Sequence, residues 1–434
     1  MKKNSVILLV AAVILFVTPL LAWSGEAAVD ALTVSLRQVE QYNFSIHILA
    51  MLLVGFGFLM VFVKKYGYGA TTGTFLTVAT GMPLYLFLRS TGVISIGAIP
   101  PDNIAVLLLA EFAAAAALIA MGAVLGRLRV YQYALVGVFA VAGYMVNEWL
   151  VLDGGLGITK GFVDAAGSIV IHSFGAYFGI GLALALTSQA SRSKAIASDE
   201  TSDRFAMLGS MVLWIFWPSF CSAVVSHEQM PLTAINTILA LCGATVMTCS
   251  TSMLLRKGKV SISDMANAAL AGGVAIGATC NRVSALGAFG VGLAAGALCV
   301  IGYVVIQPRM QSLLKIVDTC GVHNLHGMPG LLGGVIAVFV VPGIAKAQLS
   351  GIAFTVAFAL LSGATAGYLI RATGSKAAVY EDADEFESGS DDIPKPAETY
   401  RGPAPAGVPK GRAEVARRAD DREQVPDEMV VAPR

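Results

Sequence analysis

Two polar stretches in an otherwise apolar chain contain the residue types that could do chemistry. One runs from Asp164 to His172 and the other from Asp318 to His326, so the histidine follows the aspartate by eight residues in each, and a glycine stands three residues after each aspartate. Ionisable groups inside apolar segments cost free energy unless they face a cavity or a partner. Their recurrence about half a chain apart predicts an internally duplicated membrane protein in which the two halves share one site.

The two histidines are the first candidates for that site. A single buried histidine is more often a hydrogen-bonded core residue, but two at duplicate positions favour a functional pair. Neutral imidazoles that line a narrow apolar lumen can donate hydrogen bonds to a small polar molecule and accept them from it. The sequence therefore predicts that His172 and His326 line a pore.

Three further residues are predicted to support the pair. Asp164 and Asp318 each precede a helical apolar run, where a carboxylate caps free N–H groups and is favoured by the helix dipole. Stabilising a nearby cation is the alternative role for these aspartates. His323 lies three residues before His326 and on the same helix face, where it either supports the site or packs in the core.

Metal binding and catalysis are not favoured. His323 and His326 form the only close histidine pair in the sequence, whereas zinc sites take three or four protein ligands. The six cysteines have no CxxC spacing and are interpreted as packing residues. Because the sequence also lacks a phosphate loop and a nucleophile with a placed base, we expect no metal, no cofactor and no enzyme activity. A proton relay through aspartate and histidine is a better rival to the pore.

The composition places the chain in a bilayer. Hydrophobic residues make up 56% of its 434 residues and charged residues only 13%, against about 25% charged in soluble proteins. A net charge of +1 gives no reason to expect a nucleic-acid partner. Eleven apolar segments are predicted to span the membrane, at residues 43–63, 71–96, 104–126, 130–151, 163–189, 205–226, 231–255, 263–281, 285–307, 319–341 and 348–370.

The positive charges support this count, because lysine and arginine gather in cytoplasmic loops. Every second loop carries a basic group, and these groups are Lys64 and Lys65, Arg127 and Arg129, Arg192 to Arg204, Arg256 to Lys259, and Arg309 and Lys315. The mature N-terminus is therefore predicted outside and the C-terminus inside. An odd number of spans fits an inverted five-plus-five repeat with one extra helix.

The two ends of the chain differ from the part between them. Residues 1–24 have the pattern of a secretory signal peptide, although an uncleaved first helix is the alternative. Residues 25–371 are predicted to form the transmembrane domain. Residues 372–434 are acidic, proline-rich and poor in aromatic residues, which predicts a disordered cytoplasmic tail.

Several motifs resemble the Rhesus (Rh) branch of the ammonium transporter/Rh family, in a bacterial form. They run from Asp164 to Gly179, from Phe216 to Phe220, from Leu270 to Gly277 and from Asp318 to Gly330, and Val54 to Met60 agrees with them. The likeness extends over residues 43–370. It implies an all-α polytopic membrane protein of the inner (plasma) membrane that forms homotrimers with one ammonia pore per subunit.

The resemblance also assigns roles to residues. It implies that His172 and His326 are twin pore histidines, flanked by the pore-side Asp164 and Asp318. A pair of stacked phenylalanines at the outer gate falls on Phe112 and Phe220, and an outer-vestibule glutamate falls on Glu148. Cys221 stands where this pattern leads us to expect asparagine, Cys280 and Asn281 stand where an acidic residue is expected, and the loop that contains Asp153 is longer.

These residues imply that ammonium loses its proton near Glu148 and the gate, crosses the apolar pore as ammonia and is reprotonated inside. An isolated ion in a low-dielectric medium is far costlier than a neutral molecule, so ions are expected to be excluded. Carbon dioxide is the alternative cargo, because it too is small and uncharged. An ammonium sensor or docking protein that signals through the tail is the alternative from another class.

Overall fold

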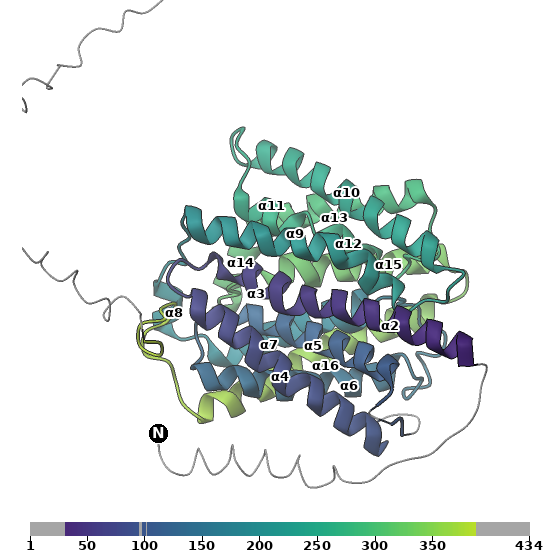
Figure 1. Cartoon of the computed structure of the whole chain (residues 1–434). Helices are drawn as coiled ribbons and strands as arrows, with labels where there is room; N and C mark the ends of the chain where they lie inside the picture. Colours follow the sequence, from purple (N-terminus) through teal and green to yellow (C-terminus); the bar gives the residue numbers. More distant parts are fainter. Residues whose placement is uncertain (1–30, 95–97, 101, 388–434) are drawn as a thin grey trace, which may run out of the picture. The chain divides into compact units, whose positions relative to one another are not determined.

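The computed structural model describes residues 31–94, 98–100 and 102–387. The predicted signal peptide at residues 1–24 and most of the predicted tail lie outside these residues. In the described part of the chain every regular element is helical, in agreement with the predicted all-α class (Figure 1).

The helices follow one another with short connections. Their bounds are α2 (Ala31–Ala50), η1 (Met51–Phe56), α3 (Gly57–Leu59), η2 (Met60–Phe62), α4 (Gly67–Thr91), α5 (Ile104–Ala123), α6 (Val130–Val151), η3 (Ser168–Ser173), α7 (Phe174–Leu186), α8 (Gln189–Ser193), α9 (Glu200–Ser222), α10 (Met230–Leu255), α11 (Ile262–Ala268), α12 (Ala271–Ile276), α13 (Ala285–Ile301), η4 (Gly302–Ile306), α14 (Gln307–Leu314), η5 (His323–Gly327), α15 (Met328–Val340) and α16 (Ala345–Ala372).

Eleven helical segments occupy the positions of the eleven predicted spans. Among the described residues, nine helices are long and apolar enough to cross a membrane. The other two segments are α4, which is 25 residues long and contains Pro83, and the shorter apolar stretch Ile262–Ile276 that joins α11 and α12. The predicted multi-span helical architecture is therefore confirmed.

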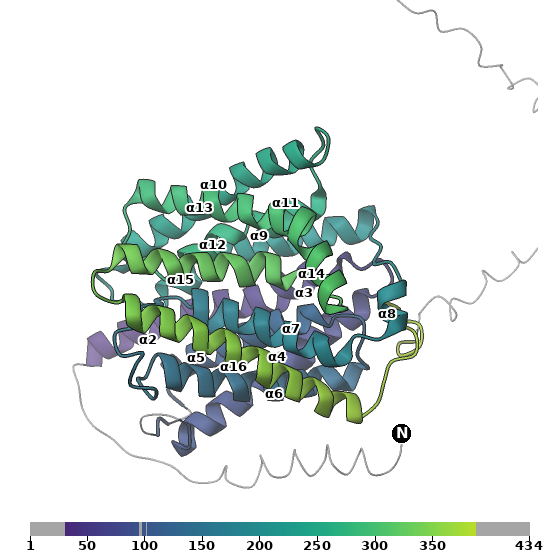
Figure 2. The ribbon, with the colours of Figure 1, turned by 180° about the vertical axis from the view of Figure 1, so that it is seen from behind.

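The two halves of the chain pack against each other through their duplicated segments. Figure 2 shows α4 to α7 and α16 lying together, with α10 to α13 on the other side of α15. The segment η3–α7 crosses η5–α15 in opposite directions, because Gly330 and Gly333 of α15 approach Ser168 at the start of η3, whereas Gly327 approaches Ala176 of α7. A Cβ on Gly330 would meet the Ser168 carbonyl, so glycine is what permits this crossing.

The two aspartates lie at opposite ends of α7. Next to Asp164, Val163 exchanges two hydrogen bonds with Gln348 at the beginning of α16, each 2.9 Å long. Asp318 lies at the other end, where the neighbouring Val317 N–H donates to Thr187 Oγ1 over 3.2 Å. This arrangement is the inverted geometry that a five-plus-five repeat requires.

The first part of the predicted disordered tail is packed onto the helices. Tyr380 is 3% exposed, and its N–H donates to the Gly126 carbonyl over 2.8 Å. Asp382 accepts hydrogen bonds of 2.8 Å from the N–H groups of Tyr68 and Gly69, the first free donors of α4. The predicted start of disorder at residue 372 is therefore too early, because charged residues in this segment satisfy groups of the bundle.

Candidate functional site

Each aspartate holds the helix start that carries a histidine. Asp164 Oδ2 accepts from the N–H groups of Ile169 and Val170 over 2.9 and 2.8 Å. In the second half, the Asp318 oxygens accept from the N–H groups of Val322 and His323, each over 3.0 Å. Both carboxylates thus occupy the capping position that the sequence predicts.

The glycine three residues after each aspartate allows the chain to turn into the helix. Gly167 and Gly321 have φ values of 78° and 69°, in the left-handed region that side chains disfavour. The turns that follow, η3 and η5, are π-helical, a wider geometry that is often found at functional sites. The equal spacing in sequence thus becomes an equal local structure around His172 and His326.

The two histidines meet inside the protein. The distance between His172 Nδ1 and His326 Nδ1 is 3.2 Å, the ring centroids are 5.3 Å apart and the ring planes differ by 9°. The side chains are 3% and 4% exposed. Because one Nδ1 must donate and the other accept, the two neutral rings present one Nε2 donor and one Nε2 acceptor. The Nε2 atom of His172 is buried and has no hydrogen-bond partner.

Aromatic rings continue from the pair on both sides. Trp217 stacks on His172 with centroids 5.6 Å apart, and Phe56 stacks on His326 at 6.1 Å. We did not predict either contact from the sequence. Trp217 lies in the motif from Phe216 to Phe220, and Phe56 lies in the motif from Val54 to Met60. Their position in these motifs is the sequence feature that points to a role near the site.

The two predicted gate residues are in contact. Phe112 and Phe220 have centroids 4.5 Å apart and an interplanar angle of 67°, so they meet edge to face rather than stacked as expected. The Phe220 ring is 6.1 Å from the His172 ring. The structure therefore brings Phe112, Phe220, His172 and His326 into one row.

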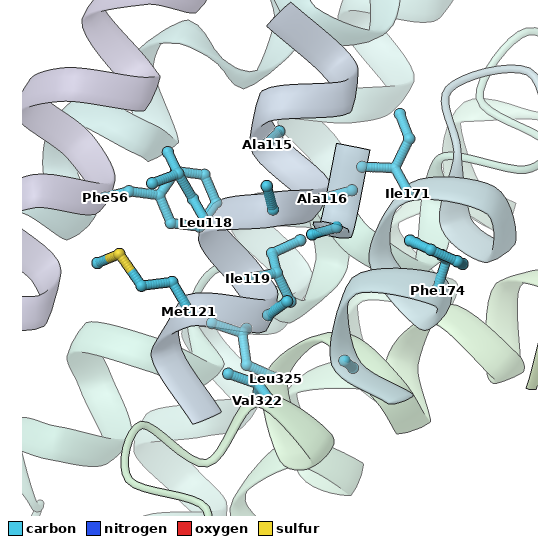
Figure 3. Packing of buried hydrophobic residues seen from close by; sticks show 14 of the residues in the cluster. Phe56, Ala115, Ala116, Leu118, Ile119, Met121, Ile171, Phe174, Val322 and Leu325 are labelled. Carbon is cyan, nitrogen blue, oxygen red and sulfur yellow. The ribbon is translucent and has the colours of Figure 1, made fainter. Parts of the chain in front are cut away.

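A small apolar cavity follows beyond His326. Its volume is about 20 Å³, room for little more than one water molecule. Phe56, Leu118 and Leu325 are among the residues that line it, and Figure 3 shows them in the surrounding apolar packing. A larger hollow of about 740 Å³ shares three lining residues with this cavity, Phe62, Asn267 and Cys320, and continues from it past Asp318.

Two predicted site residues lie apart from this row. Glu148 is buried on α6, and its carboxylate accepts hydrogen bonds from the hydroxyls of Tyr85 and Tyr144 over 2.8 and 3.1 Å. His323 lies against the edge of Tyr177 with centroids 5.7 Å apart, and its Nδ1 is buried without a partner. Neither residue has a described contact with the histidine pair or the gate.

Two cysteines that depart from the expected family pattern, Cys221 and Cys280, lie close together. Both are fully buried. The Cys280 thiol donates to the Gly277 carbonyl over 3.6 Å. Trp217 of α9 packs on Gly273 of α12, so these two helices also contact each other near the cysteines. Two buried thiols thus stand where a polar and an acidic group were expected. Within the described residues, no group of three or more possible metal ligands occurs.

Comparisons with known proteins find a matching family and similar chains. The model of the Ammonium Transporter Family matches residues 5–385. Ammonium transporter Rh type C of Gasterosteus aculeatus is 36% identical over 362 residues, which are 74% of this chain and 72% of that protein. Ammonium transporter Rh type B of Oryctolagus cuniculus is 39% identical over 360 residues, or 74% and 76% of the two chains. The solved structure of Nitrosomonas europaea Rh50, of the Rhesus protein family of channels, has a TM-score of 0.81 and 61% identity, and the match covers 82% of this chain and 95% of that one.

Proposed function

This chain belongs to the ammonium transporter family, in its Rhesus branch, and we propose that it conducts neutral ammonia along the row formed by Phe112, Phe220, His172 and His326. The family consists of transporters and not enzymes, and the protein is a multi-pass membrane protein. The observation that carries the proposal is the buried histidine pair with nearly parallel rings, in which the Nε2 of His172 has no hydrogen-bond partner.

The histidine pair replaces the hydrogen bonds that ammonia has in water. Ammonia has three donors and one lone pair, so it can give a hydrogen bond to one Nε2 and receive one from the other. A neutral polar molecule loses only a few kcal/mol when it is desolvated, and two hydrogen bonds recover much of this loss. The unpartnered Nε2 of His172 supports this role.

Ions are excluded because the path is narrow and apolar. The cavity of about 20 Å³ beyond His326 cannot hold a hydrated ion. Moving a bare ion into such surroundings costs on the order of 20 kcal/mol in the ideal limit. Ammonium therefore has to give its proton to water on the outer side of the gate before ammonia enters. The Phe220 ring, 6.5 Å from the Trp217 ring, can attract a cation there.

We assign the recruitment of ammonium to the end of the bundle near Glu148, and reprotonation to the hollow that contains Asp318. Glu148 is a buried acid whose carboxylate is held in place by two tyrosine hydroxyls, which suits a group that attracts a cation from a fixed position. Homotrimer formation, an inner-membrane location, an outside N-terminus after cleavage at residues 1–24 and a cytoplasmic C-terminus are further parts of this proposal.

The test is flux in proteoliposomes with single-histidine variants. We expect His172→Ala and His326→Ala to change ammonia-driven internal alkalinisation or its selectivity over ions by about tenfold, which corresponds to 1.4 kcal/mol. His227→Ala is the matched control, because His227 is half exposed and pairs with Glu40 away from the row. Unchanged flux and unchanged selectivity in both pore variants would refute the role of the pair.

The same experiment separates the alternatives. A carbon dioxide gradient in place of ammonia acidifies the interior if carbon dioxide is the main cargo. A sensor would conduct normally but lose its cellular response when residues 388–434 are removed. Simultaneous recording of current shows whether transport carries charge.

A further inference from the structure

A second hollow lies away from the histidine row, between the ends of α7 and α16 and the turn after α5. Its volume is about 430 Å³. Three basic residues line it, Arg127, Arg371 and Lys376, together with the hydroxyl-bearing Thr187, Ser188 and Ser375. Nothing in the proposed transport path uses this hollow.

The three basic groups are not equally neutralised. Lys376 Nζ pairs with Asp384 and Glu385 at 2.8 and 2.7 Å. In the described part of the chain, neither Arg127 nor Arg371 has a carboxylate within ion-pair distance. Two positive charges at this hollow therefore make no direct ion pair with a described carboxylate.

Arg127 is the more informative of the two arginines, because it is 5% exposed. Its terminal nitrogens donate to neutral oxygens, those of Thr187, Val317 and Ala123. Its Nε is buried without an acceptor. The Asp318 carboxylate attracts Arg127 from beyond ion-pair distance. A buried guanidinium with no direct ion pair and no acceptor for one N–H is still costly, and an acidic ligand would supply both.

We propose that this hollow binds a phosphate-bearing anion through Arg127 and Arg371. Phosphate oxygens match the planar fork of a guanidinium, and the hydroxyls of Ser188 and Ser375 can donate to the remaining oxygens. The nearest described acids face other groups. Asp384 and Glu385 bind Lys376, and the Asp318 carboxylate accepts from the N–H groups at the start of η5.

The surface of α16 points to a phospholipid as the source of the phosphate. Leu361 and Tyr368 are 70% and 61% exposed and are seven residues apart, so they lie on one face of the helix. Arg371 follows Tyr368 by three residues and continues that face. An acyl chain along this face would bring the headgroup to the arginines, and basic groups near a membrane surface attract acidic headgroups.

Binding would reach the transport path through Arg127. The guanidinium donates to the Val317 carbonyl over 2.7 Å, and the next residue, Asp318, holds the start of η5. His326 is on that segment. An anion that fixes the orientation of Arg127 would therefore also fix the segment that carries one of the histidines.

The experiment measures lipid binding to the purified full-length protein by native mass spectrometry. We expect phosphatidylglycerol to bind at a saturable site at least tenfold more tightly than phosphatidylcholine, and Arg371→Gln to remove most of that difference. Arg204→Gln is the matched control, because it removes the same charge from an exposed arginine elsewhere that pairs with Glu200. Arg127→Lys keeps the charge but not the Nε donor, and should weaken binding if it folds.

Inorganic phosphate is the second arm, followed by titration calorimetry. Binding of inorganic phosphate that depends on Arg371, without a preference for phosphatidylglycerol, would identify a free anion as the ligand of the same site. If neither ligand binds in a way that depends on Arg371, the proposal is overturned. Ammonia flux is not part of this readout, so the result is independent of the proposed transport function.

Discussion

At the scale of single residues, a substitution of Glu148 can distinguish whether this side chain recruits ammonium or only packs in the bundle. Glutamine keeps the size of the side chain, but it has no charge. Its Oε1 can accept from one of the two tyrosines, and its amide group can donate to the hydroxyl oxygen of the other. We expect Glu148→Gln to raise the apparent KM for methylammonium by about tenfold, the effect of losing roughly 1.4 kcal/mol of attraction, with little change at saturation.

Thermal unfolding of the Glu148→Gln variant in detergent is the companion measurement. A lower Tm together with an unchanged KM would show that Glu148 only holds α4 and α6 together. Gln41→Glu is a useful reference, because it adds a carboxylate near the hollow at Glu40 without touching the tyrosine cluster.

The buried carboxyl of Asp318 leads to a prediction about how the stability of the protein depends on pH. Burial raises the pKa of this carboxyl to about 6, although the N–H groups of His323 and Val322 oppose the shift. The ordinary aspartate pKa is about 3.9, so between these values the folded protein holds a proton that the unfolded chain has released. The free energy of unfolding that this carboxyl contributes therefore falls as the pH rises from about 4 to about 6.

We expect Asp318→Asn to remove that component of the pH dependence, because the amide oxygen can still accept a hydrogen bond but does not titrate. The Tm of both proteins, measured in detergent from pH 4 to pH 7, checks this. Parallel pH profiles for the variant and the unaltered protein would contradict the assignment.

At the scale of elements, the helix starts were the part that could be predicted from the sequence. An aspartate, a glycine and a histidine at equal offsets specify a cap, a left-handed turn and a buried imidazole, and these follow from local rules. The stacking of Trp217 on His172 and of Phe56 on His326 could not be predicted, because it depends on how α9 and η1 pack against the repeats.

The crossing of α15 over η3 leads to a prediction about glycine. A Cβ on Gly333 would overlap the Ala275 carbonyl and lie close to Ser168 Oγ, both of which are fixed in the core. Overpacking of this kind costs about 1–3 kcal/mol, so we expect Gly333→Ala to lower the Tm and to reduce flux by shifting η3 and His172.

Gly290 provides the matched control for the Gly333→Ala substitution. It lies within α13, and a Cβ built there meets no atom within 4 Å. Gly290→Ala should leave the Tm unchanged or raise it slightly, since alanine restricts the unfolded chain. Equal effects of the two substitutions would mean that helix propensity, rather than the crossing, determines the result.

At the scale of the whole molecule, the number of spans could be predicted because two signals agree, apolar length and the alternation of basic loops. Neither signal describes how the chain continues after α16. Composition predicted disorder from residue 372, yet Lys376 is 7% exposed, lies over the Tyr66 ring at 5.4 Å and pairs with two acids. Charges that are satisfied by specific partners cannot be distinguished from solvated charges by composition.

The packed segment also touches the hollow next to the transport path. Lys194 lines that hollow, and its Nζ donates to the Val379 carbonyl over 2.8 Å and to Glu381 over 2.6 Å. Removal of the segment would therefore free a positive charge at the mouth of the hollow and uncover the start of α4, which Asp382 caps.

Two truncations test this coupling. A chain that ends at Glu387 keeps every contact described here for the packed segment, and we expect its Tm and ammonia flux to match those of the full-length protein. A chain that ends at Gly374 loses the Asp382 cap, worth about 1 kcal/mol, and the burial of Tyr380, worth about 2 kcal/mol, so its Tm should fall by several degrees. Flux per folded molecule should change as well, because Lys194 loses both partners. If the shorter chain matched the longer one in both Tm and flux, the packed segment would be neither a structural brace nor a regulator of the hollow.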